Sequence, residues 1–148
     1  MEYKPLNILL AEDDEDDCQF FTDAIAQMKV KTKLQTFKDG EALMDYLHDP
    51  IHTTPDLIFL DLNMPRKGGM ECLEEIRKDA KLKDLVIAIY STSASENDVE
   101  DTFVRGANIY IHKPNDFPSL KKVLAEVLSV NWQYHTSGLD KANFLLSI

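Results

Sequence analysis

Short apolar runs alternate along the chain with segments in which apolar residues recur every three or four positions. A run that is apolar on both faces is typical of a buried parallel strand, whereas the three-to-four spacing is typical of an amphipathic helix. The predicted strands cover residues 7–11, 33–37, 57–60, 85–90 and 108–112. The apolar positions of the helices that follow are Cys18, Phe21, Ile25 and Met28; Ala42, Leu43, Tyr46 and Leu47; Met70, Leu73 and Ile76; Val99, Phe103 and Val104; and Leu120, Val123, Leu124, Val127 and Leu128. Five successive βα units predict an α/β fold with a parallel sheet and right-handed crossovers.

Polar residues mark several helix ends. Asp39 is a predicted N-cap of the second helix, and Gly106 is predicted to stop the fourth. Ser95, followed three residues later by Asp98, resembles a capping box. Acidic residues 15–17 suit the positive end of the first helix, which accounts for their charge without a further role.

The third apolar run ends in a carboxylate, Asp61, followed by the irregular segment Leu-Asn-Met-Pro. Pro65 removes a backbone donor and biases Met64 away from helical geometry, so the strand must give way to a loop at this point. In open α/β sheets, ligands bind outside the carboxyl ends of the strands. We therefore expect Asp61 to be presented at that edge and not buried.

Composition narrows the classes of partner. The 148 residues predict one domain, and 26 acidic against 16 basic residues give a net charge of −10. Direct nucleic-acid binding is disfavoured, because that affinity comes from Lys and Arg that neutralise phosphates. Cys18 and Cys72 lack metal-ligand spacing and are interpreted as small core residues. With no signal-like apolar core and no run near the ~20 residues of a membrane span, we expect a cytoplasmic protein with no membrane contact.

Polar residues stand at four predicted strand ends: Glu12 and Asp13, Asp61, Ser91 and Lys113. The carboxyl ends of parallel strands meet at one edge of the sheet, where three carboxylates repel one another unless a cation joins them. Mg²⁺ suits this set, since it takes oxygen ligands from one or two carboxylates, a backbone carbonyl and waters. Lys113 and Ser91 would hold the oxygens of a phosphoryl group on Asp61, which makes Asp61 the predicted nucleophile.

Taken together and in order, these motifs resemble a response-regulator receiver domain. The residues that carry the resemblance are Glu12-Asp13, Asp61, Ser91, Tyr110 and Lys113-Pro114, and it covers about residues 6–130. It implies a doubly wound five-stranded parallel sheet with strand order 2-1-3-4-5. It also implies that Asp61 accepts phosphate from a histidine kinase or a phosphotransfer protein, and that the chain catalyses only its own phosphorylation and dephosphorylation.

The resemblance further implies a set of residue roles. Asp13 and Asp61 would bind Mg²⁺ directly, the Asn63 backbone carbonyl would be a third ligand, and Glu12 would act through water. Ser91 and Lys113 would bind the phosphoryl group, Ser91 and Tyr110 would form the switch, and Thr92 and Pro114 would modulate the site.

Within the family, the chain is most similar to stand-alone regulators paired with bacteriophytochromes. The features shared with that type are the loop at residues 48–54, the Ser-Thr-Ser at residues 91–93 and the Asn-Trp-Gln-Tyr at residues 131–134. Ser91 stands where Thr is more usual and keeps the hydroxyl, whereas Gly68 stands where an acidic residue is frequent. Thr92 is bulkier than the residue often found there, so we expect it to hinder the attacking water and slow dephosphorylation.

We expect residues 1–131 to form the receiver domain and residues 132–148 a C-terminal extension without an effector domain. Output must then pass through contacts with a protein whose identity the sequence does not give, and a homodimer is one open form of such a contact. The tail ends in Asn-Phe-Leu-Leu-Ser-Ile, which either folds back on the domain or meets a partner.

Two alternative functions share parts of this pattern. An aspartyl phosphatase of the haloacid-dehalogenase type would use Asp61-Leu62-Asn63, but it usually carries its Asp-x-Asp after the first strand. A flavodoxin-like FMN carrier would share the sheet, but Glu12-Asp13-Asp14 would repel the flavin phosphate. The chain has no Gly-x-x-x-x-Gly-Lys loop, which argues against an NTPase.

Overall fold

The computed structural model describes residues 4–93, 95–129 and 145–146 of the chain. Its elements are β1 (Leu6–Ala11), α1 (Glu15–Ala26), β2 (Thr32–Phe37), α2 (Gly40–His48), β3 (Leu57–Leu60), α3 (Gly69–Lys78), β4 (Ile87–Ser91), α4 (Glu96–Val104), β5 (Ile109–His112), α5 (Phe117–Ser129) and β6 (Leu145–Leu146). The five predicted βα units are confirmed, and the strand bounds differ from the expected ones by no more than two residues.

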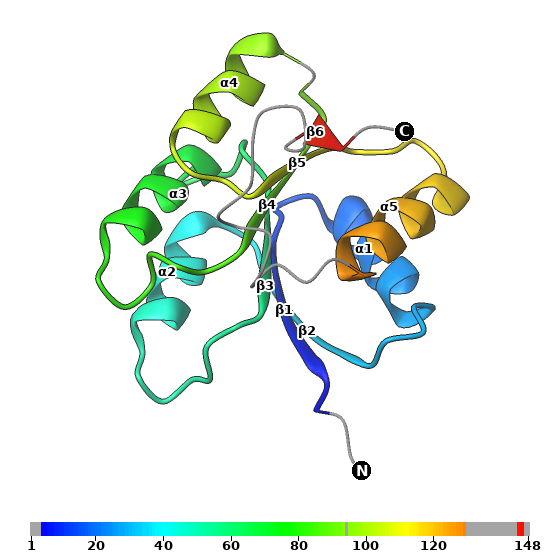
Figure 1. Cartoon of the computed structure of the whole chain (residues 1–148), viewed down its shortest axis with the longest axis horizontal. Helices are drawn as coiled ribbons and strands as arrows, with labels where there is room; N and C mark the ends of the chain where they lie inside the picture. The colour runs from blue at the N-terminus through cyan, green and yellow to red at the C-terminus, as the bar shows by residue number, and fades with distance from the viewer. Residues whose placement is uncertain (1–3, 94, 130–144, 147–148) are drawn as a thin grey trace.

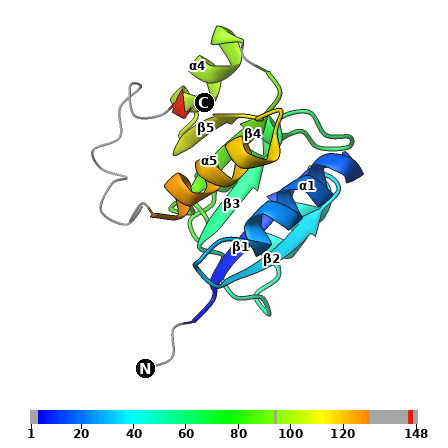
Figure 2. The ribbon, with the colours of Figure 1, turned by 90° about the vertical axis from the view of Figure 1, so that its right-hand side faces the viewer.

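All paired strands run parallel, in the order β2-β1-β3-β4-β5-β6. Helices α1 and α5 cover one face of the sheet, and α2, α3 and α4 cover the other (Figure 1, Figure 2). The doubly wound fold and the order 2-1-3-4-5 of the first five strands are therefore confirmed. All of the loops that follow the strands lie along one edge, the carboxyl edge.

The central strands are apolar on both faces because both faces are covered. On β1 and β3, the residues that pack toward α2, α3 and α4 are Leu9, Ala11, Ile58 and Leu60, and those that pack toward α1 and α5 are Ile8, Leu10, Leu57 and Phe59. On the second face, the Phe21 ring lies edge-on to Phe59 at 4.8 Å and to Tyr90 at 5.4 Å. Burial of these side chains on both faces fixes where β1 and β3 end along the strand direction. It thereby positions the residues that follow the two strands.

The predicted caps of α2 and α4 are confirmed in part. Asp39 Oδ1 accepts a hydrogen bond from Ala42 N at 2.7 Å, and Gly106 follows the last residues of α4 with φ of 96°. Ser95 caps α4 by accepting from Asp98 N, but the return half of the capping box is wrong. The Asp98 carboxylate instead accepts from the Ser93 hydroxyl at 2.6 Å, and Ser95 N donates to that same hydroxyl at 3.2 Å.

One of the apolar positions predicted for α4 does not face the core. Val104 is 71% exposed, whereas Thr102 is buried and its hydroxyl donates to Asp98 O at 2.9 Å. A threonine can take an inner position on a helix when its hydroxyl bonds to the preceding turn.

A sixth strand was not predicted. β6 extends the sheet beyond β5, with Leu145 opposite Tyr110 and Leu146 opposite Ile111. The backbone of residues 145–146 thus folds back on the domain, which was one of the two alternatives for the tail. The rest of the predicted extension, including the aromatic segment 131–134, lies outside the described residues, and the domain boundary at residue 131 stays a prediction.

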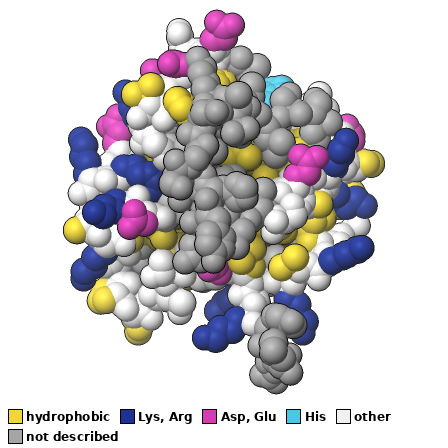
Figure 3. Space-filling view, viewed as in Figure 1, with side chains coloured by type: hydrophobic (Ala, Val, Ile, Leu, Met, Phe, Trp, Pro, Cys, Tyr) yellow, Lys and Arg dark blue, Asp and Glu magenta, His cyan; other side chains and the backbone are white. Residues whose placement is uncertain are grey.

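Within the described part of the chain, no helix combines the length and apolar character needed to cross a bilayer. Lys and Arg side chains are interspersed with Asp and Glu on the face shown in Figure 3.

Candidate functional site

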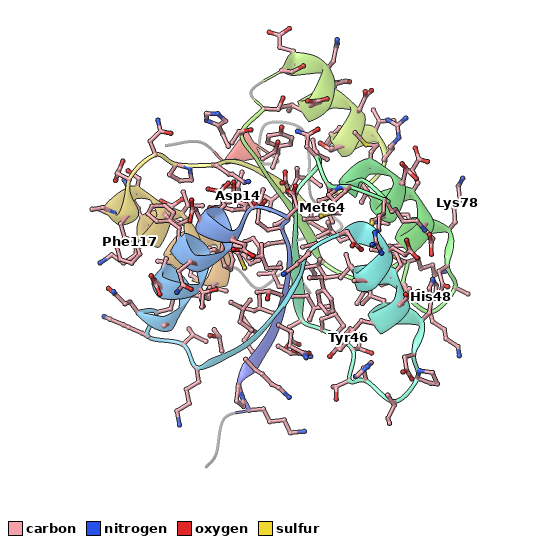
Figure 4. The ribbon with its side chains drawn as sticks, turned by 180° about the vertical axis from the view of Figure 1, so that it is seen from behind. Asp14, Tyr46, His48, Met64, Lys78 and Phe117 are labelled. Carbon is pink, nitrogen blue, oxygen red and sulfur yellow. The ribbon has the colours of Figure 1, made fainter. Side chains whose placement is uncertain are left out.

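The ends of β1 and β3 bring three carboxylates together. Asp61 N donates to Ala11 O at 3.0 Å, and Glu12 N donates to Phe37 O at 2.9 Å, so the residues just past the strands are still held in register. Figure 4 shows the loops after β1 and β3, marked by Asp14 and Met64, at the same end of the sheet. Glu12, Asp13 and Asp61 each offer an oxygen within 4.8 Å of the others. The convergence expected from the sequence is therefore present.

Asp61 lies deeper than the sequence predicted. It is only 5% exposed, so the expectation that it is not buried is wrong. The α3 amino end packs onto its backbone, where a Cβ at Gly69 would overlap the Asp61 carbonyl oxygen. One carboxylate oxygen, Oδ1, accepts from Asn63 N at 3.4 Å, and the other lies 3.6 Å from Lys113 Nζ. Asp61 is thus enclosed by its own loop and by Lys113.

Lys113 is the buried cation of this cluster. Its ammonium donates to Glu12 Oε1 and to Asp17 Oδ2, the latter at 3.1 Å, and lies 5.3 Å from the centre of the Tyr90 ring. Burial lowers the pKa of the ammonium, but the neighbouring carboxylates of Glu12, Asp61 and Asp17 raise it by more, so the net pKa is raised and Lys113 stays charged.

Sequence reasoning missed the contact between Asp17 and Lys113. It assigned Asp17 only to the start of α1, and no spacing signal links residues 17 and 113. Only the packing of α1 beside the ends of β1 and β5 brings them together.

Glu12 is the carboxylate of the cluster whose pKa is most clearly raised by its surroundings. Burial raises the pKa of its carboxyl to about 7, with the Lys113 ammonium opposing the rise and the Asp61 charge adding to it. Two buried carboxylates, those of Glu12 and Asp61, therefore lie beside the Lys113 ammonium, and the exposed carboxylate of Asp13 adds a third negative charge next to them. Hard oxygen ligands of net negative charge are the donor set that Mg²⁺ takes, so these residues fit the predicted ion.

A cavity gives solvent access to this cluster. It has a volume of about 350 Å³ and lies between α1 and the end of β2. Its lining includes the side chains of Glu12 and Asp13 together with Glu15 and Cys18 of α1. The cavity therefore opens onto the side of the cluster formed by Glu12 and Asp13.

Ser91 and Tyr110 lie at the ends of the neighbouring strands β4 and β5. Ser91 is fully buried, and its Oγ accepts from Ser93 N at 3.1 Å. Lys113 N donates to Ser91 O at 2.8 Å, which ties the end of β5 to the end of β4. Tyr110 is also fully buried, and its hydroxyl donates to Ser93 O at 2.8 Å. The ring of Tyr110, one of the two predicted switch residues, therefore lies inside the protein.

The remaining predicted site residues lie in the loops that follow the strands, around the carboxylate cluster. Asn63 is exposed in the loop after β3, Thr92 is exposed after β4, and Pro114 is half-buried after Lys113. The Thr92 carbonyl contacts His112 Nε2 at 3.0 Å. In the loop after β3, Arg66 takes a left-handed conformation with φ of 66°, and Lys67 O accepts from Gly40 N at 3.1 Å, so α2 supports this loop from below.

Comparison with known proteins agrees with this geometry. The family model described as "Response regulator receiver domain" matches residues 8–125. The chain belongs to the response regulator receiver family. The match begins within β1 and ends within α5, and it takes in every element between them, the whole carboxylate cluster and Lys113.

Individual relatives come from the same family. Response regulator Rcp1 of Synechocystis sp. is 31% identical over 129 residues, which cover 84% of this chain and 88% of Rcp1. The structure of the Mn²⁺-bound form of Rcp1 has a TM-score of 0.77 and covers 84% of this chain and 93% of that one. The phosphorylated cyanobacterial phytochrome response regulator RcpA is 30% identical, with a TM-score of 0.78 and coverage of 93% of this chain and 98% of RcpA. The predicted similarity to phytochrome-associated receivers is thereby confirmed, and neither alternative function is favoured.

Proposed function

We propose that this receiver domain, residues 1–131, accepts a phosphoryl group on Asp61 from a histidine kinase or a phosphotransfer protein. The observation that carries the proposal is the position of Asp61, next to Glu12 and Asp13 and 3.6 Å from the buried Lys113 ammonium. In the transfer, a bond forms between an Asp61 oxygen and phosphorus while the bond from phosphorus to the donor breaks. The chain's residues contribute position and charge, which is most of what phosphoryl transfer requires.

The residues around Asp61 have two roles in this proposal: some bind the phosphoryl group and the others bind Mg²⁺. Lys113 stabilises the oxygens of the transferring group, and Ser91 donates to one of them. Asp13, Asp61 and the Asn63 carbonyl would hold Mg²⁺ directly, with Glu12 acting through water. When bound, the ion supplies the positive charge that the carboxylates and the phosphoryl oxygens need. Its affinity is a property of the apo cluster and can be measured without any phosphodonor.

The reaction is confined to the chain itself. Hydrolysis of the aspartyl phosphate would use the same residues, and Thr92 at the exposed rim, with Pro114 after Lys113, would set how easily water reaches the phosphorus. The expected readout is formation and slow loss of one acyl phosphate, without multiple-turnover hydrolysis of diverse phosphoesters.

The switch is proposed to run through Ser91 and Tyr110 to an output protein. A charged acceptor on Asp61 would draw the Ser91 hydroxyl toward it, because charge-assisted hydrogen bonds are about twice as strong as neutral ones. Tyr110 in its buried position would represent one of the two states, and the other would have the ring turned out. The partner would read the face of α4, β5 and α5, and a second copy of this chain is one candidate for that partner.

Ser91→Ala and Tyr110→Ala separate the chemistry from the output. We expect Ser91→Ala to be phosphorylated without altered amide shifts in residues 99–111, and Tyr110→Ala to be phosphorylated with lost partner affinity. The measurement is NMR or amide exchange with and without beryllofluoride. Unchanged signals in the parent at full occupancy of Asp61 would refute this output route.

The assignment of Asp61 is tested by intact mass after incubation with acetyl phosphate and Mg²⁺. The parent should gain one phosphoryl group, and Asp61→Asn should gain none while keeping the parent's circular dichroism. Asp45→Asn, an exposed position on α2, removes the same charge and should behave as the parent. A phosphoryl gain on Asp61→Asn would place the acceptor elsewhere.

A further inference from the structure

Three carboxylates compete for the ammonium of Lys113. The ammonium donates to Glu12 and to Asp17 Oδ2 at 3.1 Å, and Asp61 Oδ2 lies 3.6 Å away. Of the three N–H donors of the ammonium, Glu12 and Asp17 take two, and the third faces Asp61 Oδ2 beyond hydrogen-bond distance. The two hydrogen bonds hold Nζ on the side of Glu12 and Asp17, so moving it onto the oxygens of a phosphoryl group on Asp61 draws it away from one of these partners.

The solvent exposure of each carboxylate determines which partner gives up its hydrogen bond to Lys113. The Glu12 side chain is 1% exposed, so a Glu12 carboxylate that lost Lys113 would be left buried and unpaired. The Asp17 side chain is 41% exposed, so water can replace the ammonium there at little cost. Asp17 is therefore the exchangeable partner.

We infer that Asp17 is a positioning residue, which holds Lys113 in the unphosphorylated protein and competes with the phosphoryl group for it. The inference rests on the proposed function of Asp61. When Asp61 is phosphorylated, one N–H of the ammonium that donates to Asp17 donates to a phosphoryl oxygen instead. The Asp17 carboxylate is then hydrogen-bonded by water. Asp17 thereby lowers the affinity of the site for a phosphoryl group.

The surroundings of Asp17 show why it is distinct from the other acids of the first turn of α1. Asp14 caps the helix and accepts from Asp17 N at 2.9 Å, which orients this turn beside the end of β1. Asp16 lies in the same turn but is exposed, and no hydrogen bond or ion pair joins its side chain to the site. The Tyr90 ring, 5.3 Å from Lys113 Nζ, limits the movement of the ammonium. The exchange therefore needs only a small shift of Nζ.

Neutralising Asp17 should strengthen binding at Asp61. Asp17→Asn removes the competing charge and a carboxylate that repels the incoming dianion, and both effects act in the same direction. A partly exposed ion pair of this kind corresponds to about a two- to fivefold change in an equilibrium constant. We expect that gain in beryllofluoride affinity at fixed Mg²⁺, and a matching increase in the lifetime of the aspartyl phosphate.

Asp16→Asn is the matched control, because it makes the same charge change in the same helical turn without touching Lys113. Beryllofluoride binding is measured by calorimetry on the full chain for the parent, Asp17→Asn, Asp17→Ala and Asp16→Asn. The Lys113 Nζ resonance in ¹⁵N-lysine-labelled protein gives a readout that a merely structural role would not move. It should shift in both Asp17 variants and stay in place in Asp16→Asn. Thermal melts report whether each variant is folded, and Asp17→Ala serves if Asp17→Asn is not.

The outcomes separate the two claims. If the parent binds no beryllofluoride and gains no phosphoryl group, the proposed function fails. If the parent binds but the folded Asp17 variants bind like Asp16→Asn, or more weakly, Asp17 does not compete for Lys113 and the inference is overturned. Tighter binding in the Asp17 variants, with a shifted Lys113 resonance, supports it.

Discussion

Gly69, the first residue of α3, is the position where one added methyl group tests how tightly the fold holds Asp61. A Cβ at this position would overlap the Asp61 carbonyl oxygen and lie 2.9 Å from both the Asp61 carbonyl carbon and Leu62 Cα. Non-bonded carbons prefer separations of about 3.5–4.0 Å. Gly69 N also donates to Leu62 O at 3.0 Å, so the two backbone segments cannot part without losing that hydrogen bond. Gly69→Ala must displace the loop that carries the phosphoacceptor.

The cost follows from what is displaced. Overpacking in a well-packed interior typically costs 1–3 kcal/mol, and here the obstacle is backbone, which cannot rotate aside. Taking about 2 kcal/mol, a chain of this size should melt about 4–8 °C lower than the parent. Gly68→Ala is the control, since its Cβ would meet only Leu62 O at 3.2 Å. We expect Gly68→Ala to melt within about 2 °C of the parent.

The assay is thermal unfolding by circular dichroism with and without Mg²⁺, followed by intact mass after acetyl phosphate. Gly69→Ala should lose stability, gain less from Mg²⁺ than the parent and take up phosphate more slowly, because Asp61 moves with the loop. If Gly69→Ala and Gly68→Ala melt at the same temperature and respond equally to Mg²⁺, the close approach of α3 does not position Asp61, and the reasoning is wrong.

Three further predictions test other parts of the structure. Mg²⁺ at a hundredfold excess over Kd should stabilise the parent by about 2.7 kcal/mol, and Asp13→Ala should abolish the rise in melting temperature. A thiol reagent at pH 8 should label half-buried Cys18 but spare Cys72 until denaturant is added, because burial raises the pKa of the Cys72 thiol from 9.0 to about 12. The folded state therefore keeps the Cys72 proton to a higher pH than the unfolded state does. The free energy of unfolding should fall as the pH rises from 9.0 toward 12. Arg77 donates four hydrogen bonds to the segments before β4 and β5, so Arg77→Met should lower the unfolding free energy by about 3 kcal/mol, whereas exposed Lys78→Met should change it by less than about 0.5 kcal/mol.

The sequence predicted the sheet and the meeting of Glu12, Asp13 and Asp61 because both depend on local signals. Unbroken apolar runs identify buried parallel strands, and the residue after each run necessarily lies at the carboxyl edge. The cap at Asp39 and the stop at Gly106 follow from backbone chemistry within a few residues. These features need no knowledge of what packs across the molecule.

Most of the errors concern contacts between distant segments. The burial of Asp61 comes from the amino end of α3 and from Lys113, and the contact of Asp17 with Lys113 spans 96 positions. The buried state of Tyr110 depends on how the Ser93 loop folds over it. β6 has only two residues, too short a run for any period to show, and it forms because β5 would otherwise leave an unpaired edge.

The arrangement of charge explains how a change at a buried carboxylate can be detected at the surface. Glu12, Asp17 and Asp61 surround a single ammonium, and Asp13 lies beside Glu12 and Asp61, so the site has an excess of negative charge that an added cation would relieve. These residues stand in different elements: Glu12 and Asp13 follow β1, Asp17 lies in α1, and Asp61 follows β3. Any change in how the ammonium is shared therefore acts on several loops together. Asp17 accepts a hydrogen bond from Lys113 and is also 41% exposed, so a change in how Lys113 shares its hydrogen bonds reaches solvent at the first turn of α1.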